Sequence, residues 1–93
     1  MSRRVFQSPL FERKKKLLTK SEIIVLDDVV RRICETPEIG EAKKGDLKGV
    51  FVHKFKVRDK LFLLAYKFDE NEVLLLALGR HENFYRDLER YLP

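Results

Sequence analysis

Three cations occupy alternate positions near the middle of the chain, at Lys54, Lys56 and Arg58. Alternate side chains of an extended strand point to the same face, so this spacing predicts a row of positive charge. Arginine can hold a phosphate through two parallel N–H bonds, and lysine acts as a mobile point charge. The pattern indicates a phosphate-binding strand. The alternative is a solvated strand face whose charges discourage association between sheet edges.

A second basic group, Arg80 and His81, follows Gly79 at the predicted junction of a strand and a helix. Backbone N–H groups at a helix start attract anions, which favours a phosphate site here. An imidazole at this position could also exchange protons during phosphodiester cleavage. The alternative is that His81 and Glu82 only cap the helix.

Tyr85 is a further candidate residue in the predicted last helix. Its side chain could stack on a base or supply a proton, and the competing interpretation is that the side chain is partly buried.

The remaining basic and metal-binding residue types carry weaker signals. Candidate RNA-binding residues outside the two basic groups are Lys14, Lys43, Lys44 and Lys48. Lys14 belongs to the run 13–16, which is typical of a solvated helix surface, with contact to nucleic acid or an acidic partner as the alternative. His53 shares a predicted strand face with two phenylalanines, so we expect a packed or edge histidine and not a catalytic one. Two histidines and one cysteine lack ligand spacing, which predicts no metal and no cofactor.

The periodicity around these residues predicts an α+β domain. Ser8 and Pro9 are typical of a helix start, and Thr19 with Glu22 matches a capping box. A stripe at three- and four-residue intervals from Ile23 to Ile33 predicts an amphipathic second helix. We expect an N-terminal helical hairpin packed on a small antiparallel sheet of three or four strands, with a short C-terminal helix. The predicted ranges are a short strand at 3–7, helices at 9–18 and 19–36, a loop at 37–49, strands at 50–58, 61–68 and 72–79, and a helix at 82–92.

The last two predicted strands are apolar at nearly every position, whereas a strand buried on one face would alternate. We therefore expect both sheet faces to be covered, one by the helical hairpin and the other by a partner. Phe84, Leu88 and Tyr91 mark the inner side of the last helix.

Length and charge limit the classes of protein to consider. The chain has 93 residues, which predicts one domain over 1–93. A formal net charge of +5 and a pI near 9.5 favour an anionic partner. The single Cys34 excludes an internal disulfide and is typical of a reducing cytosol. No signal peptide and no apolar run long enough to span a bilayer is visible, so we expect a cytoplasmic protein without membrane contact.

Taken together, these motifs resemble the RelE/ParE toxin superfamily. The resemblance rests on the helical hairpin, the Gly45–Gly49 entry Gly-Asp-Leu-Lys-Gly, the Lys54–Arg58 strand and the ending Leu-Gly-Arg-His-Glu-Asn-Phe-Tyr at 78–85. The order of elements agrees over essentially the whole chain. Leu63 stands where RelE toxins carry an arginine on the middle strand. Either His81 would take over part of the chemistry, or this chain would cut RNA weakly or not at all.

The resemblance implies the toxin of a type II toxin–antitoxin module, bound and neutralised by a cognate antitoxin in a hetero-oligomer. It further implies a metal-independent mRNA endoribonuclease acting at the ribosome, with the ParE-like alternative of inhibiting DNA gyrase through protein binding. A third possibility is a non-toxic module that binds nucleic acid. Catalytic roles carry over to Lys54, Lys56, Arg58, Arg80, His81 and Tyr85 of this chain.

Overall fold

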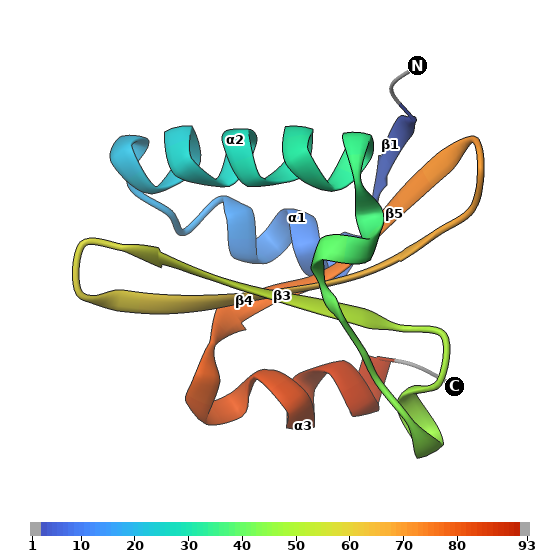
Figure 1. The fold of residues 1–93 in the computed structure, drawn as a ribbon. Helices are drawn as coiled ribbons and strands as arrows, with labels where there is room; N and C mark the ends of the chain where they lie inside the picture. The colour runs from blue at the N-terminus through green and yellow to red at the C-terminus, as the bar shows by residue number, and fades with distance from the viewer. Residues whose placement is uncertain (1–2, 92–93) are drawn as a thin grey trace.

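A five-stranded sheet lies between two layers of helices in the computed structural model (Figure 1). The described part is the backbone of residues 3–91 and the side chains of residues 3–81 and 84–90, so the predicted roles of the Glu82 and Tyr91 side chains lie outside it. The elements are β1 (Arg4–Gln7), α1 (Pro9–Lys15), α2 (Lys20–Glu35), β2 (Glu41–Ala42), β3 (Phe51–Val57), β4 (Lys60–Phe68), β5 (Glu72–Arg80) and α3 (His81–Tyr91), with 3-10 turns η1 (Pro37–Ile39) and η2 (Gly45–Leu47).

The sheet is larger than predicted, with strand order β1-β5-β4-β3-β2. The predicted antiparallel meander is present as β3, β4 and β5. Two short strands extend it: β1 pairs in parallel with β5, and β2 pairs with β3 from inside the predicted loop. The chain therefore opens on a strand that joins the sheet, ahead of the helical hairpin. The sequence did not predict β2, because a two-residue strand is too short to show a periodicity and forms only by pairing with β3.

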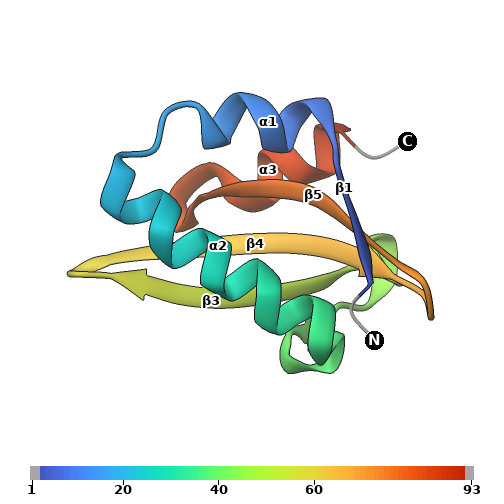
Figure 2. The ribbon, with the colours of Figure 1, turned by 90° about the horizontal axis from the view of Figure 1, so that it is seen from above.

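The helix starts follow the predicted chemistry, while the first helix is shorter than expected. Ser8 Oγ accepts a hydrogen bond from Phe11 N at the start of α1. Thr19 and Glu22 form the predicted capping box at the start of α2. α1 ends at Lys15, and Leu17, expected on its apolar side, is 78% exposed in the connection to α2. Figure 2 shows α2 lying across β4 and β3, with α1 beside β5.

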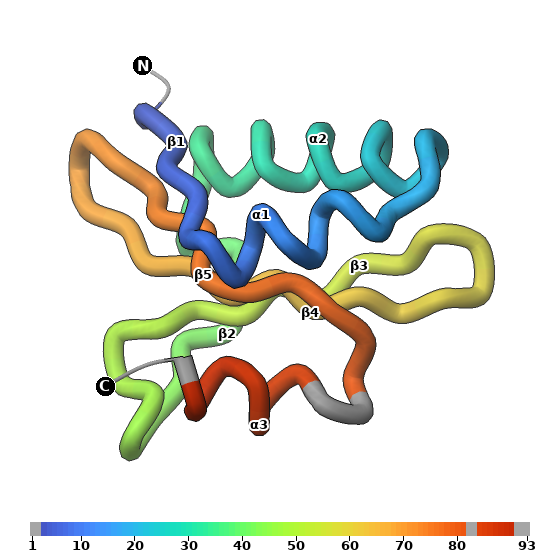
Figure 3. The backbone as a smooth tube through the Cα atoms, turned by 180° about the vertical axis from the view of Figure 1, so that it is seen from behind, coloured from blue at the N-terminus to red at the C-terminus, as the bar shows by residue number. Residues whose placement is uncertain are grey.

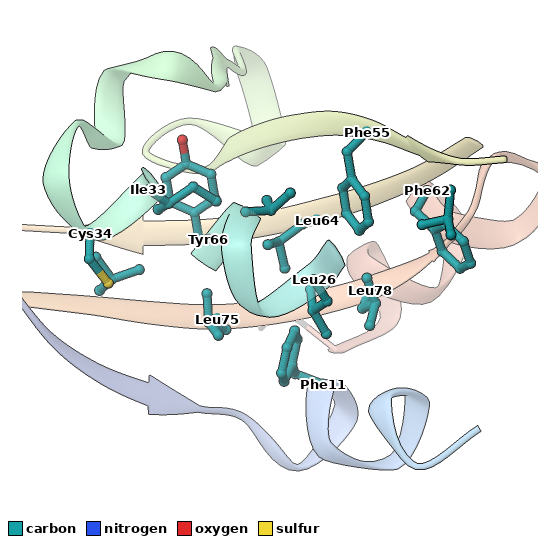
Figure 4. Close-up of a cluster of buried hydrophobic side chains, with 13 residues drawn as sticks. Phe11, Leu26, Ile33, Cys34, Phe55, Phe62, Leu64, Tyr66, Leu75 and Leu78 are labelled. Carbon is teal, nitrogen blue, oxygen red and sulfur yellow. The ribbon is translucent and has the colours of Figure 1, made fainter. Parts of the chain in front are cut away.

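Each face of the sheet carries its own apolar core. One core joins α1 and α2 to the sheet through Phe11, Leu26, Ile33, Phe55 and Tyr66 among others, as Figure 4 shows. The second core, which includes Leu63 and Ala65, packs against Phe84 and Leu88 of α3. The expectation that a partner covers the second face was therefore wrong, because α3 of the same chain does so. Both cores explain why β4 and β5 lack hydrophobic alternation.

Tyr66 ties the segment after α2 to the sheet. Its hydroxyl is fully buried, donates a hydrogen bond to the Pro37 carbonyl and accepts one from Gly40 N. Gly40 is required here because an added Cβ would collide with the Tyr66 hydroxyl. This contact fixes the point where β2 begins at Glu41, and so sets the position of the side chains that follow.

Candidate functional site

Two of the three predicted row cations lie on the sheet face that α3 covers. Lys54 stands opposite Leu63, which is fully buried against α3, and Lys56 stands opposite Leu61. Opposite residues in an antiparallel pair share a face, so both lysines belong to the α3 side. Both are exposed and belong to none of the described ion pairs, which leaves their ammonium groups open to a ligand.

Arg58 does not continue this row. The strand ends at Val57, and Arg58 has a φ of 57° in the tight turn that leads to Lys60. That left-handed conformation breaks the alternation on which the prediction depended. Arg58 instead lines a hollow of about 230 Å³ beside the start of α2, together with Thr19 and Glu22.

Arg80 and His81 are neighbours in sequence but diverge in space. Arg80 stands opposite Phe62 on the α2 side of the sheet, and its guanidinium carbon lies 5.7 Å from the Phe62 ring centre. His81 opens α3 and is exposed, with its ring centre 6.3 Å from that of Tyr85 in an edge-on arrangement. The Arg80 guanidinium therefore lies outside the predicted convergence of the basic groups, whereas His81 begins α3, the helix that covers the lysine face.

His81 lies near the lysine row because of the strand register. Gly79, two residues before it, stands opposite Leu63, and Leu63 stands opposite Lys54. Two strand spacings, or about 10 Å, therefore separate the Gly79 and Lys54 backbones. The imidazole begins the helix that covers the same face.

Lys43 joins this face from the segment after β2. Glu41 stands opposite Val52, a member of the α3-side core, and Lys43 follows two residues later with its N–H donated to the Val50 carbonyl. The Lys43 ammonium lies 2.8 Å from Glu41 Oε1 and 5.3 Å from the centre of the Tyr85 ring. Lys43 thus links the edge of the sheet to α3.

The electrostatics of this contact favour a charged lysine. The Glu41 carboxylate, helped by the Tyr85 oxygen, raises the pKa of Lys43. In turn Lys43, with a smaller contribution from Lys54, lowers the pKa of Glu41. Lys43 therefore remains protonated at neutral pH and can stabilise negative charge, whereas it is poorly suited to accept a proton.

We name these residues the β3–α3 cluster: Glu41, Lys43, Lys54, His81 and Tyr85. Tyr85 is half-buried against the α3-side core, in agreement with the interpretation that its side chain is partly buried. The cluster combines cations that can bind a phosphate with an imidazole and a phenol that can carry protons. Sequence reasoning missed Glu41 because it lies in a predicted loop, where no pattern indicated pairing with β3.

The other predicted residues lie outside the cluster. Lys44 and Lys48 are exposed at either end of η2. Lys14 lies on α1, where its ammonium is 3.8 Å from the Asp87 carboxylate. His53 is half-buried on the α2 side, where burial and the charge of Arg32 lower its pKa, so the prediction of a packed histidine is confirmed.

The described residues also give information on metal binding and on membrane spanning. Among the described side chains, those of residues 3–81 and 84–90, no group of three histidine, cysteine, aspartate or glutamate residues is placed to hold a metal ion. No helix within residues 3–91 combines the length and the apolarity that a membrane span requires.

Solved structures with this fold include RelE toxins. The toxin–antitoxin complex RelBE2 of Mycobacterium tuberculosis is 15% identical with a TM-score of 0.75, covering 87% of this chain and 100% of that one. A double mutant of Escherichia coli RelE in the free state is 18% identical with a TM-score of 0.73, covering 98% and 94%. The intact E. coli RelBE complex is 19% identical with a TM-score of 0.70, covering 87% and 99%. At these identities the likeness establishes the fold.

Sequence comparison identifies the family. No curated protein matches the chain. A family model described as the ParE-like toxin of type II bacterial toxin–antitoxin systems matches residues 5–89. Because that match spans nearly the whole chain, and the fold agrees with it, this protein belongs to the ParE-like toxins of type II bacterial toxin–antitoxin systems.

Proposed function

We propose that this toxin is a metal-independent endoribonuclease that cuts mRNA at the ribosome and so arrests translation and growth. The observation that carries the proposal is the gathering of Lys43, Lys54, His81 and Tyr85 on one accessible face. Cations, an imidazole and a phenol together supply what phosphodiester cleavage by an internal nucleophile requires.

In the proposed reaction, the RNA 2′-hydroxyl oxygen attacks the adjacent phosphorus while a base removes its proton. The bond from phosphorus to the leaving 5′-oxygen then breaks, and an acid protonates that oxygen. The products are a 2′,3′-cyclic phosphate and a 5′-hydroxyl end, so no water is consumed in this step. His81 is the candidate for one proton transfer, and Tyr85, whose ring lies beside it, is the candidate for the other.

The lysines would stabilise the phosphate as negative charge develops on it, which is commonly the largest contribution to such catalysis. Lys43 suits this role because Glu41 raises its pKa and keeps it charged. Lys54 and Lys56, exposed two residues apart on β3, present two further ammonium groups. The Glu41 carboxylate partly neutralises the positive charge of Lys43 and holds the Lys43 side chain beside Tyr85.

We also infer a cognate antitoxin as partner, forming a hetero-oligomer with this toxin. The support is that two structures of similar fold are toxin–antitoxin complexes. An acidic antitoxin segment lying over the cluster would neutralise the charges that bind RNA, so binding and inhibition would share one surface.

The test is to express the protein in cells and map the 5′ ends of mRNA. We expect new 5′ ends within coding sequences for the wild type and none for His81→Ala, with both variants binding the antitoxin equally. A matched control is His53→Gln, which removes a histidine from the opposite side of the sheet. Full cleavage by His81→Ala would refute the assignment.

The second candidate function is inhibition of DNA gyrase by protein binding, which the ParE-like family model favours. Such an inhibitor needs no proton transfer, so His81→Ala would keep its toxicity. A supercoiling assay with purified gyrase separates the two functions. Loss of supercoiling together with intact mRNA would select the inhibitor.

A further inference from the structure

A basic groove runs along the other side of the molecule, between α1 and α3. Two neighbouring hollows, of about 230 Å³ and about 410 Å³, share Leu10, Lys14 and Asp87 in their linings and so form one continuous depression. Figure 3 shows β5 passing between α1 and α3 on this side. We name it the α1–α3 groove, defined by Leu10, Arg13, Lys14, Arg80, Asp87 and Arg90.

The fold creates this groove where β1 stops. β1 pairs only with residues 72–75 of β5, so the rest of that edge has no neighbouring strand. Ser8 turns the chain away: its hydroxyl donates a hydrogen bond to the Leu76 carbonyl and accepts one from Phe11 N. α1 then runs beside the remainder of β5, and α3 folds back from Arg80. The two walls are therefore tied to the sheet.

The groove combines cations with a small amount of open apolar surface. Arg13, Lys14 and Arg90 line the groove with one described carboxylate, Asp87, which lies 3.8 Å from the Lys14 ammonium. Arg80 also lines the groove, while its guanidinium lies over the Phe62 ring. Among the described side chains, no carboxylate lies within ion-pair distance of the three arginines. Its apolar members are already covered: Leu10 is 8% exposed and Phe84 is 3% exposed.

This composition selects a polyanion over an amphipathic protein segment. An apolar helix face would find little uncovered surface to bury, whereas a chain of phosphates would find the cations Arg13, Lys14 and Arg90. The groove also begins at Arg80, directly before His81 in the sequence. A strand bound at the β3–α3 cluster could therefore continue around the end of β5 into this groove.

We propose that the α1–α3 groove binds the sugar–phosphate backbone of the RNA strand that flanks the cleaved bond. The inference rests on the proposed function, because it extends the path of the same RNA. The groove would hold RNA by charge alone, so it would raise affinity without selecting a base sequence.

The test measures binding of a fluorescent 2′-O-methyl oligoribonucleotide, which lacks the attacking hydroxyl and so remains uncut. The double variant Arg13→Gln/Arg90→Gln should bind more weakly than the wild type. Each lost phosphate contact should reduce the slope of log affinity against log salt by about 0.7, or about 1.4 for both. The matched control is Arg4→Gln/Lys20→Gln, which removes the same charge from exposed positions on β1 and α2.

Asp87→Asn should raise the affinity for RNA, which is the opposite of the effect expected for Arg13→Gln/Arg90→Gln. A folding defect would not produce tighter binding. Asp87 is the one acid among the described residues that line the groove, and it engages Lys14. Neutralising it frees that ammonium and removes repulsion toward phosphate, so RNA binding should become tighter and more salt-dependent. Unchanged or weaker binding would count against the proposal.

Failure of the groove and failure of the proposed function give different results. If the wild type cuts mRNA while the arginine double variant binds RNA as the control does, only the groove proposal is overturned. If the double variant instead loses antitoxin affinity and keeps RNA affinity, the groove is a protein-binding surface and the proposal is wrong. If the wild type neither binds nor cuts RNA, the proposed function falls, and the groove proposal with it.

Discussion

The ammonium of Lys43 lies 5.3 Å from the centre of the Tyr85 ring, so a residue between β2 and η2 meets a residue of the last helix. A cation near an aromatic face is attracted by the ring's quadrupole. The contact closes one side of the β3–α3 cluster and places a fixed positive charge beside a phenol. It also depends on Glu41, whose carboxylate accepts a hydrogen bond from the same ammonium.

Glu41→Gln should lower the pKa of Lys43, because the carboxylate is the largest cause of its elevation. Side-chain NMR of Lys43 during an alkaline titration measures the change directly. Glu12→Gln is the matched control, since Glu12 is exposed on α1 outside the cluster. An unmoved Lys43 titration in the Glu41 variant would show that the ion pair is not maintained in solution.

His81→Ala and Arg80→Ala should impair RNA cleavage in different ways. The imidazole lies beside Tyr85, whereas the Arg80 guanidinium lies over Phe62 on the other side of the sheet. We expect His81→Ala to lower kcat, and Arg80→Ala to raise KM with kcat nearly unchanged. Steady-state cleavage of a model RNA measures both. A fall in kcat for Arg80→Ala equal to that for His81→Ala would mean that both side chains act on the reacting phosphate.

His53 should make the protein less stable as the pH falls. Burial, with the charge of Arg32, lowers its pKa in the folded state, so the unfolded state binds the proton more readily. The stability associated with neutral His53 is therefore complete above the unfolded value, about 6.5, and is lost as the pH falls toward the lower folded value. Urea unfolding between about pH 8 and about pH 5 should show a smaller loss for His53→Gln than for the wild type. A pH dependence equal to that of the wild type would contradict this account.

Tyr66→Phe should destabilise the fold by about 1–3 kcal/mol, because two buried backbone groups lose their partner. Gly40→Ala should also destabilise it, since the new Cβ meets the Tyr66 hydroxyl. The double variant should be more stable than the sum of the two losses predicts, because removing the hydroxyl relieves part of the collision. Denaturant unfolding of all four proteins measures the coupling, and strict additivity would argue against the contact.

Ser8→Ala should both destabilise α1 and weaken RNA binding in the α1–α3 groove. The buried hydroxyl caps α1 and donates to the Leu76 carbonyl, so its loss removes two hydrogen bonds. The expected cost is about 1–2 kcal/mol of unfolding free energy, read from urea titrations. Ser21→Ala, at an exposed position of α2, is the control. Equal stability of the two variants would mean that Ser8 does not tie α1 to the sheet.

Local sequence signals determined most of the secondary structure. Ser8 and the Thr19–Glu22 box define helix starts because each side chain bonds to its own first turn. The run of apolar residues in β4 and β5 correctly indicated two covered faces. The alternation at Lys54 and Lys56 correctly put both lysines on one face, since a strand's pleat is a property of the local backbone.

Only the tertiary structure decided which chemical groups come together. Arg58 left the row because its turn needs a positive φ, and Arg80 and His81 parted because a strand ends between them and a helix begins. Glu41 and Lys43 reached Tyr85 through the pairing of β2 with β3, a contact between residues distant in sequence. Periodicity describes neighbours along the chain, whereas the charge cluster and the groove are set by strand register and helix packing, which no short window of sequence contains.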